Sequence, residues 1–174
     1  MRIILIGFMG SGKTALGKRL AKKLQYPFFD TDLLIEKHEG KSIQEIFNQL
    51  GETYFRKQEA NLIRSFQFPE DCIIACGGGL PCHNENMKQL LRLGFVFYLK
   101  LSVDFLTKRL ELNNESRPLL SGLETAKALQ DYVAQTLSQR ECQYSLANQT
   151  LALESIKPKQ VINSMLESLK FAIH

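Results

Sequence analysis

Paired cysteines and long apolar runs are both missing from this sequence of 174 residues. It has four cysteines, and they form no Cys-x-x-Cys pair, so the spacing typical of a zinc site or a disulfide framework is absent. We therefore expect reduced thiols and a cytoplasmic protein. The apolar stretches are only a few residues long, whereas a membrane-spanning helix needs about 20, so we expect no contact with a membrane.

A strong excess of one charge is missing as well. The 22 Lys and Arg residues against 18 Asp and Glu residues give a net charge of +4, and no basic run occurs. This balance does not predict nucleic-acid binding, but it fits a modest positive field that attracts small anions. The ordinary hydrophobic content of 44% excludes disordered and fibrous proteins. The length predicts one domain over residues 1–174, which we expect to be a monomer.

Short apolar runs alternate with helical patterns along the chain. Parallel strands need long crossover connections, so this alternation predicts an α/β fold of three layers, with a parallel sheet covered by helices on both faces. Two connections are long enough to carry substrate contacts, one at residues 31–66 with room for two or three helices and one at residues 113–122. The candidate strands are residues 3–6, 28–29, 72–76, 95–99 and 150–153.

Residues 7–14, Gly-Phe-Met-Gly-Ser-Gly-Lys-Thr, match a phosphate-binding loop. The match lies between a predicted strand and a predicted helix, as the mechanism requires. Glycines let backbone N–H groups converge on phosphate oxygens, and the helix offers its positive end while Lys13 adds a point charge. The Thr14 hydroxyl is placed to bind Mg²⁺. The loop therefore indicates a nucleotide site.

The rest of the sequence narrows the class of nucleotide-binding protein. The Asp-x-x-Gly and Asn-Lys-x-Asp motifs of GTPases are absent. The strand at residues 72–76 runs into Gly77, Gly78 and Gly79, where a motor ATPase would carry acidic residues. Small-molecule kinases are left as the leading class.

Two carboxylates and three glycines follow predicted strands, and each group has two interpretations. Asp30 and Asp32 would lie at the carboxyl edge of the sheet beside the phosphate-binding loop, where one could serve Mg²⁺ and the other the acceptor. Asp residues also cap helices, and an apolar helical pattern follows them. The three glycines permit close approach of the backbone to a ligand, or they form a plain turn.

Three arginines are candidates for binding anions. Arg56 borders the apolar stripe of its helix, and Arg140 falls inside such a stripe, so an anionic partner is needed. That partner is either a ligand or a structural carboxylate. Arg117 lies in the polar connection at residues 113–122 and is either a ligand contact or an ordinary exposed residue.

These motifs together resemble shikimate kinase. The loop at residues 7–14, Asp-Thr-Asp, Gly-Glu-x-x-Phe-Arg, Gly-Gly-Gly, Arg-Pro-Leu-Leu and Arg-x-x-x-Tyr occur in this order over residues 3–144. The resemblance implies a P-loop kinase fold with a five-stranded parallel sheet, a substrate-binding region near residues 31–61 and a lid near residues 110–124. It also implies phosphorylation of the 3-hydroxyl of shikimate by ATP and Mg²⁺, in the pathway to chorismate and aromatic amino acids.

The resemblance also implies roles for single residues. Asp32 would bind the reacting hydroxyl, and Arg56 and Arg140 would hold the carboxylate of shikimate beside Gly77, Gly78 and Gly79. Thr14 and Asp30 would serve magnesium. The residues implied on the nucleotide are Gly10, Ser11, Gly12, Lys13, Thr14, Ala15, Arg109 and Arg117. One departure is Cys76, because the family pattern has Ser or Thr before the glycines.

Two other functions stay open at this point. Gluconate kinase or another small-molecule kinase would share the phosphate-binding loop. A nucleotide-sensing module without transfer activity would need no acceptor pocket, so Arg56, Arg140 and Asp32 would then lie far apart.

We expect Lys13→Ala to lower turnover at least about a hundredfold, because water cannot replace an ammonium that stabilises the transferred phosphoryl group. A steady-state assay of the variant, with its fold checked by circular dichroism, measures the effect. Normal turnover in a well-folded variant would contradict the assignment of the phosphate-binding loop.

Overall fold

The fold is built on a sheet of five parallel strands in the order β2-β3-β1-β4-β5. The computed structural model describes residues 1–112, 125–154 and 157–172. All four pairings between neighbouring strands are parallel, so the carboxyl ends of the strands share one edge of the sheet. The strands are β1 (Arg2–Ile6), β2 (Phe28–Asp30), β3 (Cys72–Ala75), β4 (Phe95–Lys100) and β5 (Gln149–Ala152).

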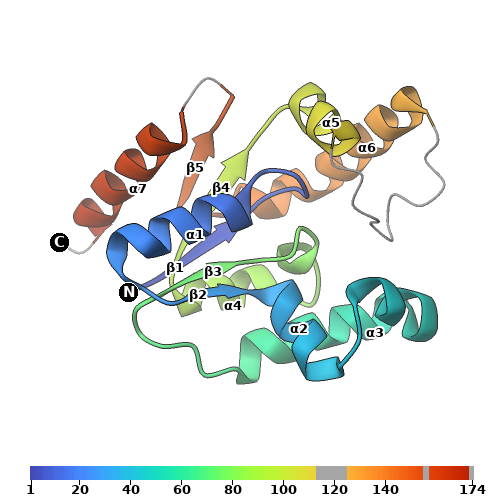
Figure 1. Cartoon of the computed structure of the whole chain (residues 1–174), viewed down its shortest axis with the longest axis horizontal. Helices are drawn as coiled ribbons and strands as arrows, with labels where there is room; N and C mark the ends of the chain where they lie inside the picture. The colour runs from blue at the N-terminus through green and yellow to red at the C-terminus, as the bar shows by residue number, and fades with distance from the viewer. Residues whose placement is uncertain (113–124, 155–156, 173–174) are drawn as a thin grey trace.

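Helices cover both faces of this sheet (Figure 1). One face packs against α1 and α7, and the other packs against α3, α4 and α6. The predicted three-layer α/β fold is therefore confirmed. The helices are α1 (Lys13–Leu24), α2 (Thr31–Glu39), α3 (Ile43–Ser65), the 3₁₀ turn η1 (Leu80–Cys82), α4 (Asn86–Leu93), α5 (Val103–Leu112), α6 (Ala126–Tyr144) and α7 (Pro158–Ala172).

The position of β1 at the centre of the sheet explains why residues 3–6 are all apolar. Ile3 and Leu5 belong to the core on the α1 and α7 side, whereas Ile4 and Ile6 belong to the core on the opposite side. All four side chains are at most 1% exposed. A strand between two helical layers must be apolar on both faces, because side chains alternate along it.

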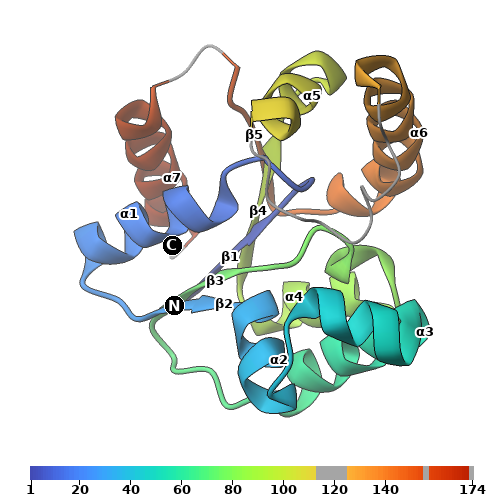
Figure 2. The same cartoon turned by 45° about the vertical axis from the view of Figure 1, so that its right-hand side comes forward.

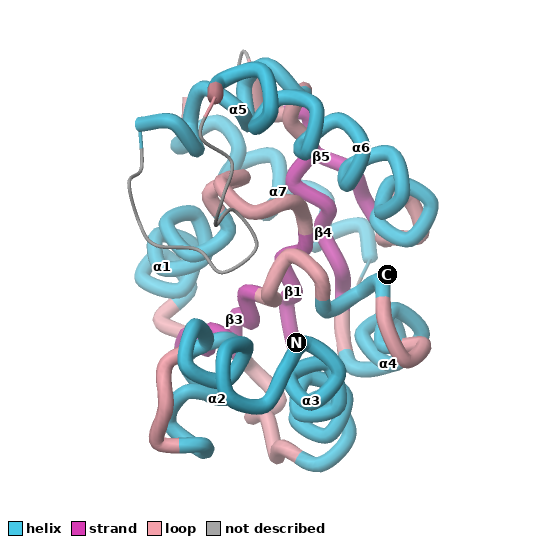
Figure 3. The backbone as a smooth tube through the Cα atoms, turned by 90° about the vertical axis from the view of Figure 1, so that its right-hand side faces the viewer, coloured by secondary structure: helices cyan, strands magenta, loops and turns pink. Residues whose placement is uncertain are grey.

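The long connection at residues 31–66 forms α2 and α3, as its length predicts. Gly51 interrupts α3 with a φ of 82°, so the helix is kinked there. Ile35, Ile46 and Phe55 form a small apolar cluster that fixes α2 against α3. Figure 2 shows these two helices as a pair, and Figure 3 shows them on one side of the carboxyl edge with α5 on the other. Both flanks of this edge are therefore walled by helices.

The expected lid is described only where it overlaps α5, at residues 110–112. The rest of it, with Arg117, lies outside the described residues. Within the part of the chain that the structure describes, no helix combines the length and apolar character that crossing a membrane requires.

Gly94 joins α4 to β4 in close contact with the first strand. A Cβ atom at Gly94 would lie 2.3 Å from the carbonyl oxygen of Arg2. The φ of Gly94 is −179°, which any residue adopts, so close approach and not conformational freedom requires glycine here.

We therefore expect Gly94→Ala to lower the free energy of unfolding by about 3 kcal/mol, because backbone atoms cannot yield to the added methyl group. Gly40→Ala is the matched control. Gly40 has a φ of 64° and open space around its Cβ position, so only conformational strain of about 1 kcal/mol opposes alanine there. Urea denaturation compares the two variants, and a larger loss in Gly40→Ala would contradict the packing argument.

Candidate active site

The loop between β1 and α1 folds around the side chain of Lys13. The Lys13 ammonium donates to the carbonyl oxygens of Gly7 and Phe8, both at 2.9 Å. Gly10 and Gly12 have φ values of 79° and 92°, which other residues rarely adopt. Because α1 begins at Lys13, the N–H groups of its first turn and the positive end of this helix face the loop. The loop has the geometry of an anion cradle.

A cavity of about 940 Å³ opens beside this loop. Arg109 of α5 closes one side of it, and its guanidinium donates to the carbonyl oxygens of Gly10 at 3.2 Å and Ser11 at 3.4 Å. The ring of Phe105 supports the same guanidinium at 4.9 Å. The predicted nucleotide residues that line the cavity are Gly10, Ser11, Gly12, Lys13, Thr14, Ala15 and Arg109.

Asp30 caps a helix and also contacts the phosphate-binding loop. One carboxylate oxygen accepts from the backbone N–H of Asp32 at 3.1 Å and so caps α2. The other accepts from the Thr14 hydroxyl at 2.8 Å. A hydroxyl and a carboxylate side by side at the phosphate-binding loop are oxygen donors of the kind that Mg²⁺ takes together with phosphates and water. These two residues therefore fit a magnesium site.

Asp32 lies deeper in the site, and its Oδ1 atom is buried without a hydrogen-bond partner among the described residues. Burial raises the pKa of Asp32 to about 6, and the neighbouring Asp30 carboxylate adds to the rise. Lys13 and Arg56 act in the opposite direction, and Glu36 adds a smaller rise. A carboxylate with a raised pKa and one oxygen that no described group uses can accept a hydrogen bond or a proton from a bound group.

The three glycines after β3 form a strip where the predicted residues meet. A Cβ atom on Gly77 would lie 2.4 Å from Asp32 Oδ1, and one on Gly79 would lie 2.5 Å from a guanidinium nitrogen of Arg56. A Cβ atom on Gly78 would lie 3.2 Å from the backbone nitrogen of Met9 in the phosphate-binding loop. Close approach of the backbone, and not a turn with positive φ, therefore explains the three glycines.

Arg56 is 7% exposed and already has carboxylate partners. Its guanidinium donates to Glu59 at 2.7 Å and to Glu52 at 2.9 Å. The structural ion pair that sequence reasoning left open is thus present. Burial alone would lower the pKa of Arg56, but Glu59 and Glu52 raise it, so the arginine stays charged.

Glu59 is a site residue that the sequence analysis missed. It is fully buried, and burial raises its pKa to about 7 although Arg56 opposes the rise. Its Oε1 atom has no hydrogen-bond partner within the described ranges. The signal was present in the sequence, because Glu52, Arg56 and Glu59 stand at the i, i+4 and i+7 spacing of one helix face.

Arg140 differs from Arg56 because it forms no ion pair with any described residue. Its guanidinium lies over the ring of Phe8 at 5.5 Å, and its Nη1 atom is buried without a partner in the described part of the chain. Gly78 is close, with its Cβ position 3.6 Å from that nitrogen. A buried guanidinium nitrogen without a partner favours an anionic ligand over a structural carboxylate.

Cys76 is 2% exposed and lies in the apolar core on the α4 and α6 side of the sheet. Burial raises the pKa of its thiol above the usual range. Because the thiolate is the nucleophilic form, this burial makes the Cys76 thiol a weak nucleophile.

Known proteins resemble the chain over nearly its whole length. The family model for shikimate kinase matches residues 9–170. A shikimate kinase from Bacteroides fragilis is 35% identical over 170 residues, which cover 98% of this chain and 94% of the relative.

Two solved structures share the fold. The shikimate kinase of Bacteroides thetaiotaomicron is 35% identical and has a TM-score of 0.90, with 98% of each chain covered. The shikimate kinase of Acinetobacter baumannii, solved in complex with shikimate, is 28% identical and has a TM-score of 0.88. That match covers 98% of this chain and 93% of the other.

The raised pKa of Asp32 predicts a dependence of stability on pH. The ordinary pKa is 3.8 and the folded value is about 6, so the folded state binds the proton more tightly and loses stability as pH rises between these values. Asp32→Asn removes this loss. The melting temperature of the variant should therefore exceed that of the wild type by about 3 °C or more at pH 8, with a much smaller gap near pH 4.

Thermal unfolding of both proteins across this pH range measures the gap. Asp131→Asn, at an exposed position on α6, is the control and should show no gap at either pH. A gap for Asp32→Asn that does not change with pH would contradict the raised pKa.

Proposed function

Because this chain belongs to the shikimate kinase family, we propose that it transfers the terminal phosphoryl group of ATP to the 3-hydroxyl of shikimate. The products are shikimate 3-phosphate and ADP, on the pathway to chorismate and the aromatic amino acids. One observation carries the proposal. Asp32, Arg56 and Arg140 converge on the glycine strip beside the phosphate-binding loop, so a carboxylate-bearing alcohol can be held next to nucleotide phosphates.

On the nucleotide side, Lys13 and the backbone N–H groups of residues 10–15 hold the phosphates of ATP, with Arg109 beside them. Lys13 would exchange its bonds to Gly7 and Phe8 for phosphate oxygens. Thr14 and Asp30 would hold Mg²⁺, which when bound neutralises charge on the β- and γ-phosphates. The 2.8 Å contact between the two side chains supports this assignment.

On the acceptor side, Arg140 and Arg56 bind the carboxylate of shikimate, and the glycine strip lies along its ring. The unpartnered nitrogen of Arg140 supplies a donor that no described protein group uses. Asp32 aligns the 3-hydroxyl and accepts its hydrogen bond, and with a pKa of about 6 it is ionised at neutral pH. Phosphoryl transfer needs mainly such positioning and charge stabilisation.

The proposal extends to the rest of the chain. We propose that residues 1–174 belong to one domain and that α2 and α3 provide the substrate-binding region near residues 31–61. We also propose that residues 110–124, most of which lie outside the described part of the chain, serve as a lid that brings Arg117 to the transferred phosphoryl group. The enzyme acts as a cytoplasmic monomer on small molecules and binds neither nucleic acid nor membranes.

A coupled assay of ADP release tests the function directly. The protein with Mg²⁺ and ATP should release ADP at an appreciable rate only when shikimate is added. Gluconate serves as the alternative acceptor, and faster turnover with gluconate would overturn the substrate assignment. Nucleotide binding without turnover on any acceptor would favour a sensing module, although the convergence of Asp32, Arg56 and Arg140 speaks against it.

Arg140→Lys should raise the KM for shikimate about tenfold and leave the KM for ATP within about twofold, because an ammonium cannot match a bidentate guanidinium on a carboxylate. Steady-state kinetics in both substrates measure the two constants. Arg92→Lys, at an exposed position on α4, is the control and should change neither. If a shikimate analogue without the carboxylate is phosphorylated with the same kcat/KM as shikimate, the role of Arg140 is contradicted.

A further inference from the structure

Arg140 lacks the carboxylate anchors that orient Arg56. Glu59 and Glu52 bond the Arg56 guanidinium directly, whereas Arg140 forms no ion pair with a described residue. The ring of Phe8 lies under the Arg140 guanidinium, but a ring does not fix the direction of the N–H groups as a carboxylate does, so the position of Arg140 also depends on how its helix, α6, is held against the sheet. A small rotation or slide of α6 would move the guanidinium away from the glycine strip.

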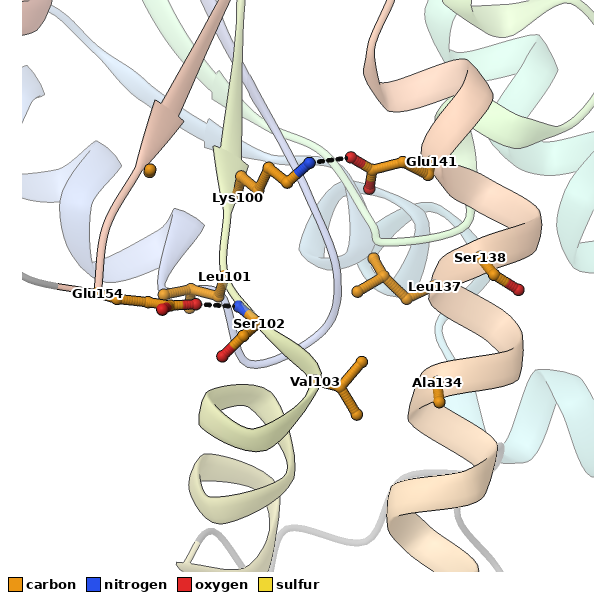
Figure 4. Close-up of a pocket in the computed structure, with 10 residues that line it drawn as sticks. Lys100, Leu101, Ser102, Val103, Ala134, Leu137, Ser138, Glu141 and Glu154 are labelled. Carbon is orange, nitrogen blue, oxygen red and sulfur yellow. Dashed lines mark hydrogen bonds and ion pairs between the residues drawn. The ribbon is translucent and has the colours of Figure 1, made fainter.

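The next residue on α6, Glu141, attaches the helix to β4. Its carboxylate accepts from the Tyr98 hydroxyl at 2.7 Å and from the Lys100 ammonium at 2.5 Å. Figure 4 shows the Lys100 and Glu141 side chains reaching toward each other from β4 and α6, at one end of a cavity of about 710 Å³. Beside Leu137 and Ala134 of α6, this cavity takes the place of direct apolar packing between α6 and the end of β4. The polar contacts of Glu141 therefore connect the two elements where apolar side chains do not.

Tyr98 also contacts the same helix in a second place. Its ring lies 5.0 Å from the ring of Tyr144, and the Tyr144 hydroxyl donates to the carbonyl oxygen of Gly78 at 2.5 Å. Tyr144 is four residues after Arg140, so both side chains lie on one face of α6. A continuous set of contacts thus runs from Glu141 through Tyr98 and Tyr144 to the glycine strip.

We propose that Glu141 is a positioning residue for acceptor binding, which holds α6 against β4 so that the Arg140 guanidinium stays over the glycine strip. This inference rests on the proposed function. Glu141 does not contact the acceptor itself, because its carboxylate faces Tyr98 and Lys100.

The two partners of Glu141 contribute unequally to holding α6. The Lys100 side chain is 51% exposed, and exposed ion pairs contribute little because water screens them. Tyr98 is 1% exposed, so loss of its acceptor would leave a buried hydroxyl unpaired. The hydrogen bond from Tyr98 is therefore the stronger of the two restraints that Glu141 provides for α6, and a neutral acceptor at position 141 can preserve it.

The experiment compares Glu141→Ala with Glu141→Gln, whose amide oxygen can still accept from Tyr98. Glu141→Ala should raise the KM for shikimate about fivefold to tenfold, while the KM for ATP and kcat change less than about twofold. Glu141→Gln should restore a value near that of the wild type. Tyr98→Phe should also raise the KM for shikimate. The double variant Tyr98→Phe/Glu141→Ala should have a KM for shikimate no higher than that of Glu141→Ala alone, because the two substitutions remove the same hydrogen bond.

Ser138→Ala is the matched control, since Ser138 lines the same cavity on the same helix and its hydroxyl donates to the carbonyl oxygen of Gln135 on that helix. It should leave all constants unchanged. An unchanged KM for shikimate in Glu141→Ala would overturn the inference. So would a parallel rise in both KM values together with a lower melting temperature, which a general loss of structure would produce. Absence of shikimate turnover in the wild type would instead overturn the proposed function.

Discussion

The register of three parallel strands determines the geometry of the whole site. Ala75 of β3 is paired with Leu5 of β1 on one side and with Asp30 of β2 on the other. The chain continues for two residues beyond each of these positions to reach Gly77, Gly7 and Asp32. Gly7, Asp32 and Gly77 therefore come together at the carboxyl edge, where a Cβ atom on Gly77 would lie 2.4 Å from Asp32 Oδ1. A shift of one residue in either pairing would separate them and reverse the face of each following side chain.

This arrangement concentrates charge where water has been removed. Asp32 and Glu59 have raised pKa values because they are buried, and Arg140 keeps a buried nitrogen without a partner among the described residues. Such groups lower the stability of the free protein, since each loses hydration without a full set of hydrogen bonds. A bound acceptor with one carboxylate and one hydroxyl would satisfy Arg140 and Asp32 together. The site is therefore organised for a ligand and not for the stability of the free chain.

Sequence reasoning succeeded where local chemistry determines the structure. The phosphate-binding loop and the strands of the sheet follow from glycine positions and apolar runs. No end of an observed strand differs from the predicted one by more than one residue, and β5 at Gln149–Ala152 is shifted by one residue at both ends. It missed Glu59 because a charged residue on a helix is ordinarily exposed. Glu59 is buried against the glycine strip, where a Cβ atom on Gly77 would lie 3.2 Å from its Oε1 atom, and this tertiary contact is not visible in the sequence. The role of Tyr144 could not be predicted either, because its hydrogen bond to Gly78 joins segments that are 66 residues apart in the sequence.

Cys76 shows how a departure from the family pattern can be accommodated. Its backbone N–H donates to the carbonyl oxygen of Leu5 at 3.0 Å, so the pairing of β3 with β1 continues one residue past the strand. Side chains alternate along this extension, and Cys76 therefore shares its face with Ile74 and lies in the apolar core with Ile4 and Ile6. A Ser or Thr hydroxyl in this orientation would need a hydrogen-bond partner, whereas a thiol is satisfied by apolar contact. The thiol is thus compatible with an apolar core that ends where the glycine strip begins.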